Sequence, residues 1–210
     1  MFITPMSNPN RSFVSLNHGD FYRQFEERHR GSRDSVKQRL LVYLDFINRL
    51  RVSDQVFSVV DLGCGQGEWL EILREANINA IGVDIDAEML KVCQGYGLST
   101  KQNDAKAALT ECESSSVNVI TSFHLVEHLS FDYLLELISE SHRVLKPGGL
   151  LIIETPNPEN IWVAGHNFYV DPSHVRPIPP ALLGFAIEYS GFNRSCLLRL
   201  QEDKKLSDCL

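Results

Sequence analysis

The sequence lacks the features that mark several common protein classes. It has no apolar run long enough to cross a membrane and no leader in which basic residues precede an apolar segment. We therefore expect a cytoplasmic protein without a transmembrane segment. Its five cysteines are scattered and form no C-x-x-C pair, so we predict reduced thiols rather than a disulfide framework or a zinc site. No internal repeat and no low-complexity tract is present.

Positive charge is scarce as well. The 20 lysines and arginines are outnumbered by 27 aspartates and glutamates, which gives a formal net charge of -7. Proteins bind nucleic acids largely by neutralising phosphates, so this charge balance argues against a nucleic-acid partner. It does not exclude a local basic patch on the surface. With 210 residues, of which 43% are hydrophobic, the chain is long enough for one domain with a full core.

What the sequence does contain is a glycine-rich stretch behind a short apolar segment. Residues 57–62 have the composition of a buried parallel strand, and a segment with helical periodicity follows the glycines. The glycines are Gly63, Gly65 and Gly67. Glycine permits positive φ angles and lets the backbone approach a ligand closely. A dinucleotide-binding turn has a glycine where this chain has Glu68, and that carboxylate and Asp61 would repel a pyrophosphate, so the turn suits a cationic ligand.

Strand-like and helix-like segments alternate along the rest of the chain. Predicted strands cover residues 57–62, 80–83, 98–102, 117–123, 150–154 and 193–201, and predicted helices cover 32–50, 87–93, 105–110, 131–144 and 181–190. This alternation predicts an α/β fold with a doubly wound, mostly parallel sheet. We expect a loose tail over residues 1–20, N-terminal helices that form a lid over 21–56, the ligand-binding domain over 57–201 and a short tail over 202–210.

Several polar residues stand at the ends of predicted strands, where parallel sheets bind ligands. Asp84 follows the second strand, a position from which an acidic side chain binds ribose hydroxyls in nucleotide-binding folds. Asn103, Asp104 and Ala105 follow the third strand. Asp104 can accept a hydrogen bond from an adenine amino group, or it can cap the helix at 105–110, and both interpretations stay open.

Together, these stretches resemble the class I methyltransferases that use S-adenosylmethionine (SAM). The resemblance covers roughly residues 20–200 and rests on residues 61–67, 82–84, 103–105, 124–129 and 145–150. It implies a Rossmann-like, seven-stranded sheet, but we expect the final antiparallel strand to be missing or rudimentary, because the chain stops soon after the predicted sixth strand. The residues expected at the cofactor are Asp61, Gly63, Gly65, Gly67, Asp84, Asn103, Asp104, Ala105, His124 and Arg30. Arg30, from the lid, would clamp the SAM carboxylate, and a solvated charged corner is its alternative.

Three further segments resemble one bacterial subgroup, which includes the O-antigen chain-terminating methyltransferases. They are residues 25–33 (FEERHRGSR), 123–129 together with 154–160 (FHLVEHL and ETPNPEN), and 168–180 (FYVDPSHVRPIPP). The resemblance implies O-methyl transfer to a carbohydrate, such as the terminus of a surface polysaccharide, with a glycosyltransferase or a second copy of the chain as a candidate partner. Three alternatives stay open: transfer to a small molecule, transfer to an RNA 2′-oxygen, and SAM binding without turnover in a truncated protein.

The segment after the fourth predicted strand carries acid–base chemistry. If the acceptor is a hydroxyl, a base must take its proton as the methyl group arrives. His128 is our candidate for that base, with Glu127 or Asp171 orienting it. His174 and Tyr169 lie in a connection long enough to be functional, and they could close over the acceptor.

Other interpretations of these residues stay open. The favoured one assigns no metal, but Glu127, His128 and His174 could also hold a divalent cation together with the acceptor's oxygens. The ubiquinone-pathway O-methyltransferases and the small-RNA terminal 2′-O-methyltransferases have a similar Glu-His pair after the fourth strand. The H-x-x-E-H metalloprotease pattern needs a long helix, whereas this segment follows a strand. Finally, Glu127 and His128 could simply cap and pack the next helix.

Overall fold

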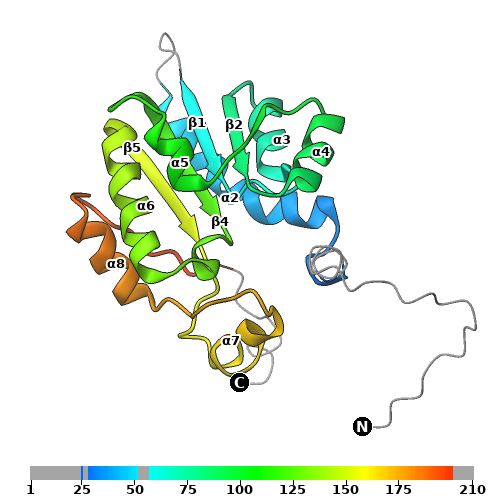
Figure 1. Cartoon of the computed structure of the whole chain (residues 1–210), viewed down its shortest axis with the longest axis vertical. Coiled ribbons are helices and arrows are strands. Elements are labelled where there is room, and N and C mark those ends of the chain that lie inside the picture. Colours follow the sequence, from blue (N-terminus) through cyan, green and yellow to red (C-terminus); the bar gives the residue numbers. More distant parts are fainter. Residues whose placement is uncertain (1–24, 26–27, 52–56, 201–210) are drawn as a thin grey trace, which may run out of the picture. The chain divides into compact units, whose positions relative to one another are not determined.

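The computed structural model describes residues 25, 28–51 and 57–200, and its central element is one parallel sheet (Figure 1). Its strands are β1 (Ser58–Leu62), β2 (Asn79–Asp84), β3 (Thr100–Gln102), β4 (Val117–Phe123) and β5 (Leu145–Glu154). They lie in the order β3-β2-β1-β4-β5, and all neighbouring pairs are parallel. This order confirms the predicted doubly wound α/β fold, in which the direction of winding reverses between β1 and β4.

Along the chain, helices precede, connect and follow the strands (Figure 1). They are α2 (Arg33–Leu50), α3 (Glu68–Glu75), α4 (Ala87–Gly95), α5 (Ala105–Thr110), α6 (Phe131–Val144), α7 (Ile161–Gly165) and α8 (Pro180–Tyr189), with two short 3₁₀ helices, η1 (Val126–His128) and η2 (Asn167–Val170). Asp86, Asp104 and Ser130 cap α4, α5 and α6 by accepting hydrogen bonds from backbone N–H groups of the first turn. In the part of the chain that the structure describes, no helix combines the length and the apolarity that crossing a membrane requires.

The central strands are buried, which explains their continuous apolar runs. Val60 of β1 and Ile120 of β4 belong to one cluster with Leu109 of α5 and Leu137 of α6. Helices α3 and α4 form a second buried cluster, which includes Cys64 of the glycine turn. Strands covered in this way need no polar face, as is usual in parallel sheets.

The chain divides into two compact units, residues 1–39 and 40–210, and the sequence of α2 runs across that boundary. In the first unit, Ser32 precedes α2, and its Oγ caps the helix by accepting a hydrogen bond from the Ser35 N–H at 3.2 Å. Arg30 belongs to this unit, and its place at the cofactor stays a prediction. The predicted tails at both ends lie outside the described residues.

The predicted sixth strand is wrong. Residues 193–200, the described part of the predicted segment 193–201, form no strand. A strand needs a neighbour for its backbone hydrogen bonds, and this segment makes side-chain contacts instead, such as that from Arg199 Nε to Glu159 at 2.8 Å. No antiparallel strand occurs among residues 57–200, and β5 is an edge of the described sheet.

Strand β5 also begins earlier than predicted. The sequence predicted a strand over 150–154 only, but Leu145 already pairs with Val117 of β4. The register then shifts before the pairing resumes, and Gly148 in this irregular part has a φ of +80°. The glycine therefore marks a bulge inside a longer strand rather than a separate turn.

Candidate cofactor and acceptor site

The glycine turn between β1 and α3 has a backbone that side chains would disturb. Gly63, Gly65 and Gly67 have φ angles of +70°, +52° and +80°. All three lie in the left-handed region that favours glycine. A Cβ atom on Gly67 would lie 2.6 Å from Cδ1 of Leu98 and 2.8 Å from Sγ of Cys93, closer than such atoms approach. The N–H of Gly63 donates to the carbonyl of Val83 at 2.8 Å and ties the turn to the end of β2.

The side chain of Asp84, at the end of β2, lies against this turn. Its Oδ2 accepts a hydrogen bond from the Gly65 N–H at 2.9 Å, and its Oδ1 accepts one from the Asp86 N–H at 2.9 Å. An ionised carboxylate has about four lone-pair sites, so two or so stay open for ribose hydroxyls. The structure thus places Asp84 beside the turn, and its bond to a ribose stays a prediction.

Asp61 brings a buried carboxyl group under the same turn. It is 2% exposed, and Thr121 Oγ1 donates to its Oδ1 at 2.7 Å. Burial raises the pKa of Asp61 to about 7; the Thr121 hydrogen bond opposes this shift, and the nearby carboxylates of Asp84 and Glu68 add to it. A bound cation would relieve this concentration of negative charge, as the sequence predicted for the turn.

Asp104 serves as a helix cap, which confirms one of its two interpretations. Its Oδ1 accepts hydrogen bonds from the N–H of Ala107 at 3.0 Å and from the hydroxyl of Tyr133 at 2.6 Å. Asn103, which precedes it, donates through Nδ2 to Glu111 at 2.9 Å. Ala105 is buried in the core. Contact of these residues with an adenine stays a prediction.

His124 bridges two carboxylates just after β4. Its φ of +52° is unusual for a residue other than glycine. Nδ1 lies 3.2 Å from Oε1 of Glu127, and Nε2 lies 3.0 Å from Oε1 of Glu154. Burial alone would lower the pKa of His124, but the two carboxylates raise it well above the ordinary value. The ring is therefore a cation that holds both carboxylates in place, and its predicted contact with the cofactor stays a prediction.

Two residues that the sequence did not single out complete this arrangement. The Tyr43 hydroxyl, from the part of α2 in the second unit, donates to the Glu154 carboxylate. Thr155 Oγ1 donates to Oε2 of Glu127 at 2.9 Å. Thr155 lies in one of the segments that resemble the bacterial subgroup, so a signal existed; Tyr43 lies on the apolar side of a helix and gave none.

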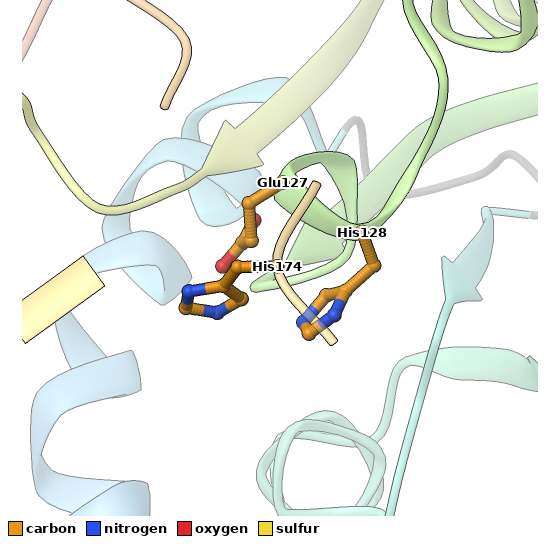
Figure 2. Close-up of side chains that lie close together, drawn as sticks. All are labelled: Glu127, His128 and His174. Atoms are coloured by element: carbon orange, nitrogen blue, oxygen red, sulfur yellow. The ribbon is translucent and has the colours of Figure 1, made fainter. Parts of the chain in front are cut away.

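Three of the predicted catalytic residues, Glu127, His128 and His174, form a cluster that we call the acceptor pole (Figure 2). The first two come from η1 and the third from the connection between β5 and α8. One potential ligand atom of each lies within 4.8 Å of the others. The imidazole rings are 4.8 Å apart at 63°. The N–H of Val175 donates to the Glu127 carbonyl at 2.8 Å and ties this connection to η1.

Hydrogen bonds fix the tautomers of both histidines. Ser173 Oγ donates to Asp171 Oδ1 at 2.6 Å, so at 2.9 Å it accepts from Nδ1 of His128. Nδ1 of His174 lies 2.6 Å from the carbonyl of Phe168, which can only accept. In neutral rings, Nε2 of each histidine therefore carries a lone pair. Asp171 orients His128 through Ser173 rather than directly, and the sequence did not single out this serine.

His128 is not sealed inside the core. Its side chain is partly buried, and burial lowers its pKa; the neighbouring Glu127 raises it, and His174 lowers it further. Tyr169, predicted to close over the acceptor, is 66% exposed and is not among the cluster's residues.

Comparison with known proteins shows the family. The sequence model of the methyltransferase domain matches residues 35–193. The chain belongs to the class I SAM-dependent methyltransferases. This methyltransferase resembles the crystal structure of a SAM-dependent methyltransferase from Archaeoglobus fulgidus, with a TM-score of 0.76 and 34% identity over 88% of this chain and 86% of that one.

Two curated relatives are similar over part of their length. A probable SAM-dependent methyltransferase from Mycolicibacterium smegmatis is 28% identical over 134 residues, which is 64% of this chain and 51% of the relative. A malonyl-[acyl-carrier protein] O-methyltransferase from Coxiella burnetii is 34% identical over 145 residues, or 68% of this chain and 47% of the relative. The chain thus spans about half the length of these relatives.

SAM is the cofactor of this family, and the residues around the glycine turn fit it. The sulfonium and the amino group of SAM are cations, and Asp61 lies buried under the turn near two other carboxylates. The glycines leave the backbone open to close approach. Asp84 has acceptor capacity left for hydroxyls. The glycine turn therefore combines negative charge and an open backbone, which suit a cationic cofactor.

Proposed function

We propose that this methyltransferase moves the methyl group of SAM to a hydroxyl oxygen of a carbohydrate, such as the end of a polysaccharide. One observation carries the proposal: Ser173 holds Nδ1 of His128, which leaves Nε2 able to take a proton beside Glu127 and His174. This acceptor pole follows β4, and the glycine turn follows the neighbouring parallel strand β1, so both lie at the same edge of the sheet.

The chemistry is an in-line displacement. The acceptor oxygen attacks the methyl carbon, the bond from that carbon to sulfur breaks, and its electron pair stays on sulfur. The acceptor's proton passes to Nε2 of His128, whose other nitrogen is held by Ser173 and Asp171. A base in this role contributes roughly 10²–10⁴-fold in rate, and holding the two reactants in contact contributes several kcal/mol.

Three further features support a carbohydrate hydroxyl as the methyl acceptor. The relative from Coxiella burnetii is named an O-methyltransferase. The net charge of -7 disfavours RNA. Residues 168–180, which supply His174 and Ser173, resemble the segment of the O-antigen chain-terminating methyltransferases.

The test is a transfer assay with SAM labelled in its methyl group. Purified protein is offered oligosaccharides, lipid-linked glycans, small phenols, a malonyl thioester and a short RNA, and each product is separated and digested to locate the label. We expect label in a methyl ether of the glycans. Label in another class alone would overturn the carbohydrate proposal. Tight SAM binding by calorimetry without transfer to any acceptor would support the alternative of a SAM-binding protein without turnover.

A further inference from the structure

We propose that Glu127, His128 and His174 bind one divalent transition-metal ion, which holds the acceptor's oxygen for methyl transfer. The inference rests on the proposed function and changes one part of it, the fate of the acceptor's proton. Figure 2 shows the carboxylate and the two imidazoles side by side, although His174 comes from a connection distant in sequence.

The tautomers of the two histidines are those that metal ligation requires. Each Nδ1 is a hydrogen-bond donor, that of His128 to Ser173 and that of His174 to the Phe168 carbonyl. A ligating imidazole usually donates its second N–H in this way to a carbonyl, carboxylate or similar group, which fixes the ring. Both Nε2 lone pairs are therefore free for a cation. The nearest contact of His174 Nε2 with Asp171 is 3.9 Å, too long for a hydrogen bond.

Glu127 is held as firmly as the histidines. Its side chain is fully buried, Thr155 donates to Oε2 at 2.9 Å, and His124 lies 3.2 Å from Oε1. A carboxylate has about four lone-pair sites, so acceptor capacity remains for a metal. The carboxylate and both imidazoles are therefore held in place before any ion binds.

The donor set indicates the class of metal. Two imidazole nitrogens and one carboxylate suit zinc, iron, cobalt or manganese better than calcium, which prefers oxygen ligands. Ligand atoms around such an ion lie roughly 3–4 Å apart, given bonds of about 2.1 Å. The atoms here are within 4.8 Å of one another, so small side-chain rotations would close the site. Three protein ligands leave positions open for the acceptor.

The ion would change how the acceptor loses its proton. Coordination lowers the pKa of a bound hydroxyl, so its proton passes to water rather than to His128. The oxygen then attacks the methyl carbon, and the electron pair of the broken bond stays on sulfur. With the metal bound, His128 is a metal ligand and not the base that takes the acceptor's proton. Metal binding can therefore be tested separately from the role of His128 as base.

Binding is tested first, by titrating chelator-treated full-length protein with Mn²⁺ alone and following the free ion by electron paramagnetic resonance. We expect one site per chain. H128N and H174N keep a donor where Nδ1 stands but remove Nε2, and E127Q removes the charge; each should weaken binding at least about 10-fold. H166N alters an exposed histidine of the same connection and should leave binding unchanged. No binding, or binding that is unchanged in H174N and E127Q, would overturn the inference.

Activity separates this inference from the proposed function. Chelator-treated enzyme should lose methyl transfer, and Mn²⁺ or Zn²⁺ should restore it. Full activity after chelation, with no Mn²⁺ bound, would overturn the metal site and leave His128 as the base. One Mn²⁺ bound by the three residues, with no acceptor methylated in the assay above, would support the site and count against the proposed function.

Discussion

At the scale of single residues, the buried carboxyl group of Asp61 should make SAM binding depend on pH. Asp61 has a pKa of about 7 in the free protein because it is buried and lies near other carboxylates. A bound cation favours the ionised form and lowers this pKa. SAM binding near pH 7 should therefore release protons, and SAM affinity should rise as the pH rises toward about 7 and level off above it.

The measurement is isothermal titration of SAM in two buffers with different heats of ionisation. The apparent enthalpy should differ between the buffers by the protons released. D61N keeps an oxygen that can accept from Thr121 but cannot ionise, so its enthalpy should be the same in both buffers. Equal proton release by the variant and the wild type would assign the effect to another group.

The strand ends allowed part of the site to be predicted residue by residue. Asp84 and His128 were predicted because ligand residues follow parallel strands, and Asp61 because it precedes the glycine turn; their roles stay predictions. Ser173 and Thr155 were not singled out, although they fix His128 and Glu127. Their contacts join segments distant in the sequence, and periodicity reports only on neighbours along the chain.

At the scale of elements, the glycine turn makes the sharpest structural prediction. G67A puts a Cβ atom against Leu98 and Cys93 at a positive φ, so we expect a loss of roughly 1–3 kcal/mol in the free energy of unfolding and weaker SAM binding. G184A is the matched control. Gly184 lies inside α8 with no atom near its missing Cβ, so this variant should gain about 1 kcal/mol. Denaturant unfolding and SAM titration of both variants check this, and wild-type stability and affinity in G67A would contradict it.

The caps of α4 and α5 separate a structural role from a binding role. D86A and D104A each remove a cap and should each cost about 1 kcal/mol of unfolding free energy. If Asp104 also accepts a hydrogen bond from the adenine amino group, D104A should weaken SAM binding and D86A should not. Calorimetric titration of folded protein checks this, and the same SAM affinity in both variants would leave Asp104 as a cap alone.

The bounds of the strands show which structural features the local sequence predicts and which it does not. Strands β1 and β4 were predicted nearly to the residue because their runs are buried and apolar. The segment 193–201 contains the apolar residues Cys196, Leu197, Leu198 and Leu200, yet no strand forms over 193–200. Strand pairing depends on a neighbouring strand, which the local sequence does not report. The early start of β5 and its bulge were not predicted for the same reason. Pro147, Gly148 and Gly149 are residue types typical of a turn, and the pairing with β4 is not visible in the local sequence.

At the scale of the whole molecule, the fold places the cofactor turn and the acceptor pole at one sheet edge but on different elements. The turn follows β1 and the pole follows β4. The Archaeoglobus fulgidus structure shares this architecture over most of both chains. The two functions should therefore be separable by mutation.

The most direct measurement is to compare SAM affinity and methyl transfer in H128N. This variant keeps the donor to Ser173 but has no Nε2. With the acceptor class found by the transfer assay, we predict an unchanged dissociation constant for SAM and a rate lower by at least about 100-fold, whether His128 acts as base or as ligand. Transfer at the wild-type rate, or a loss of SAM binding in proportion to the loss of rate, would contradict the account.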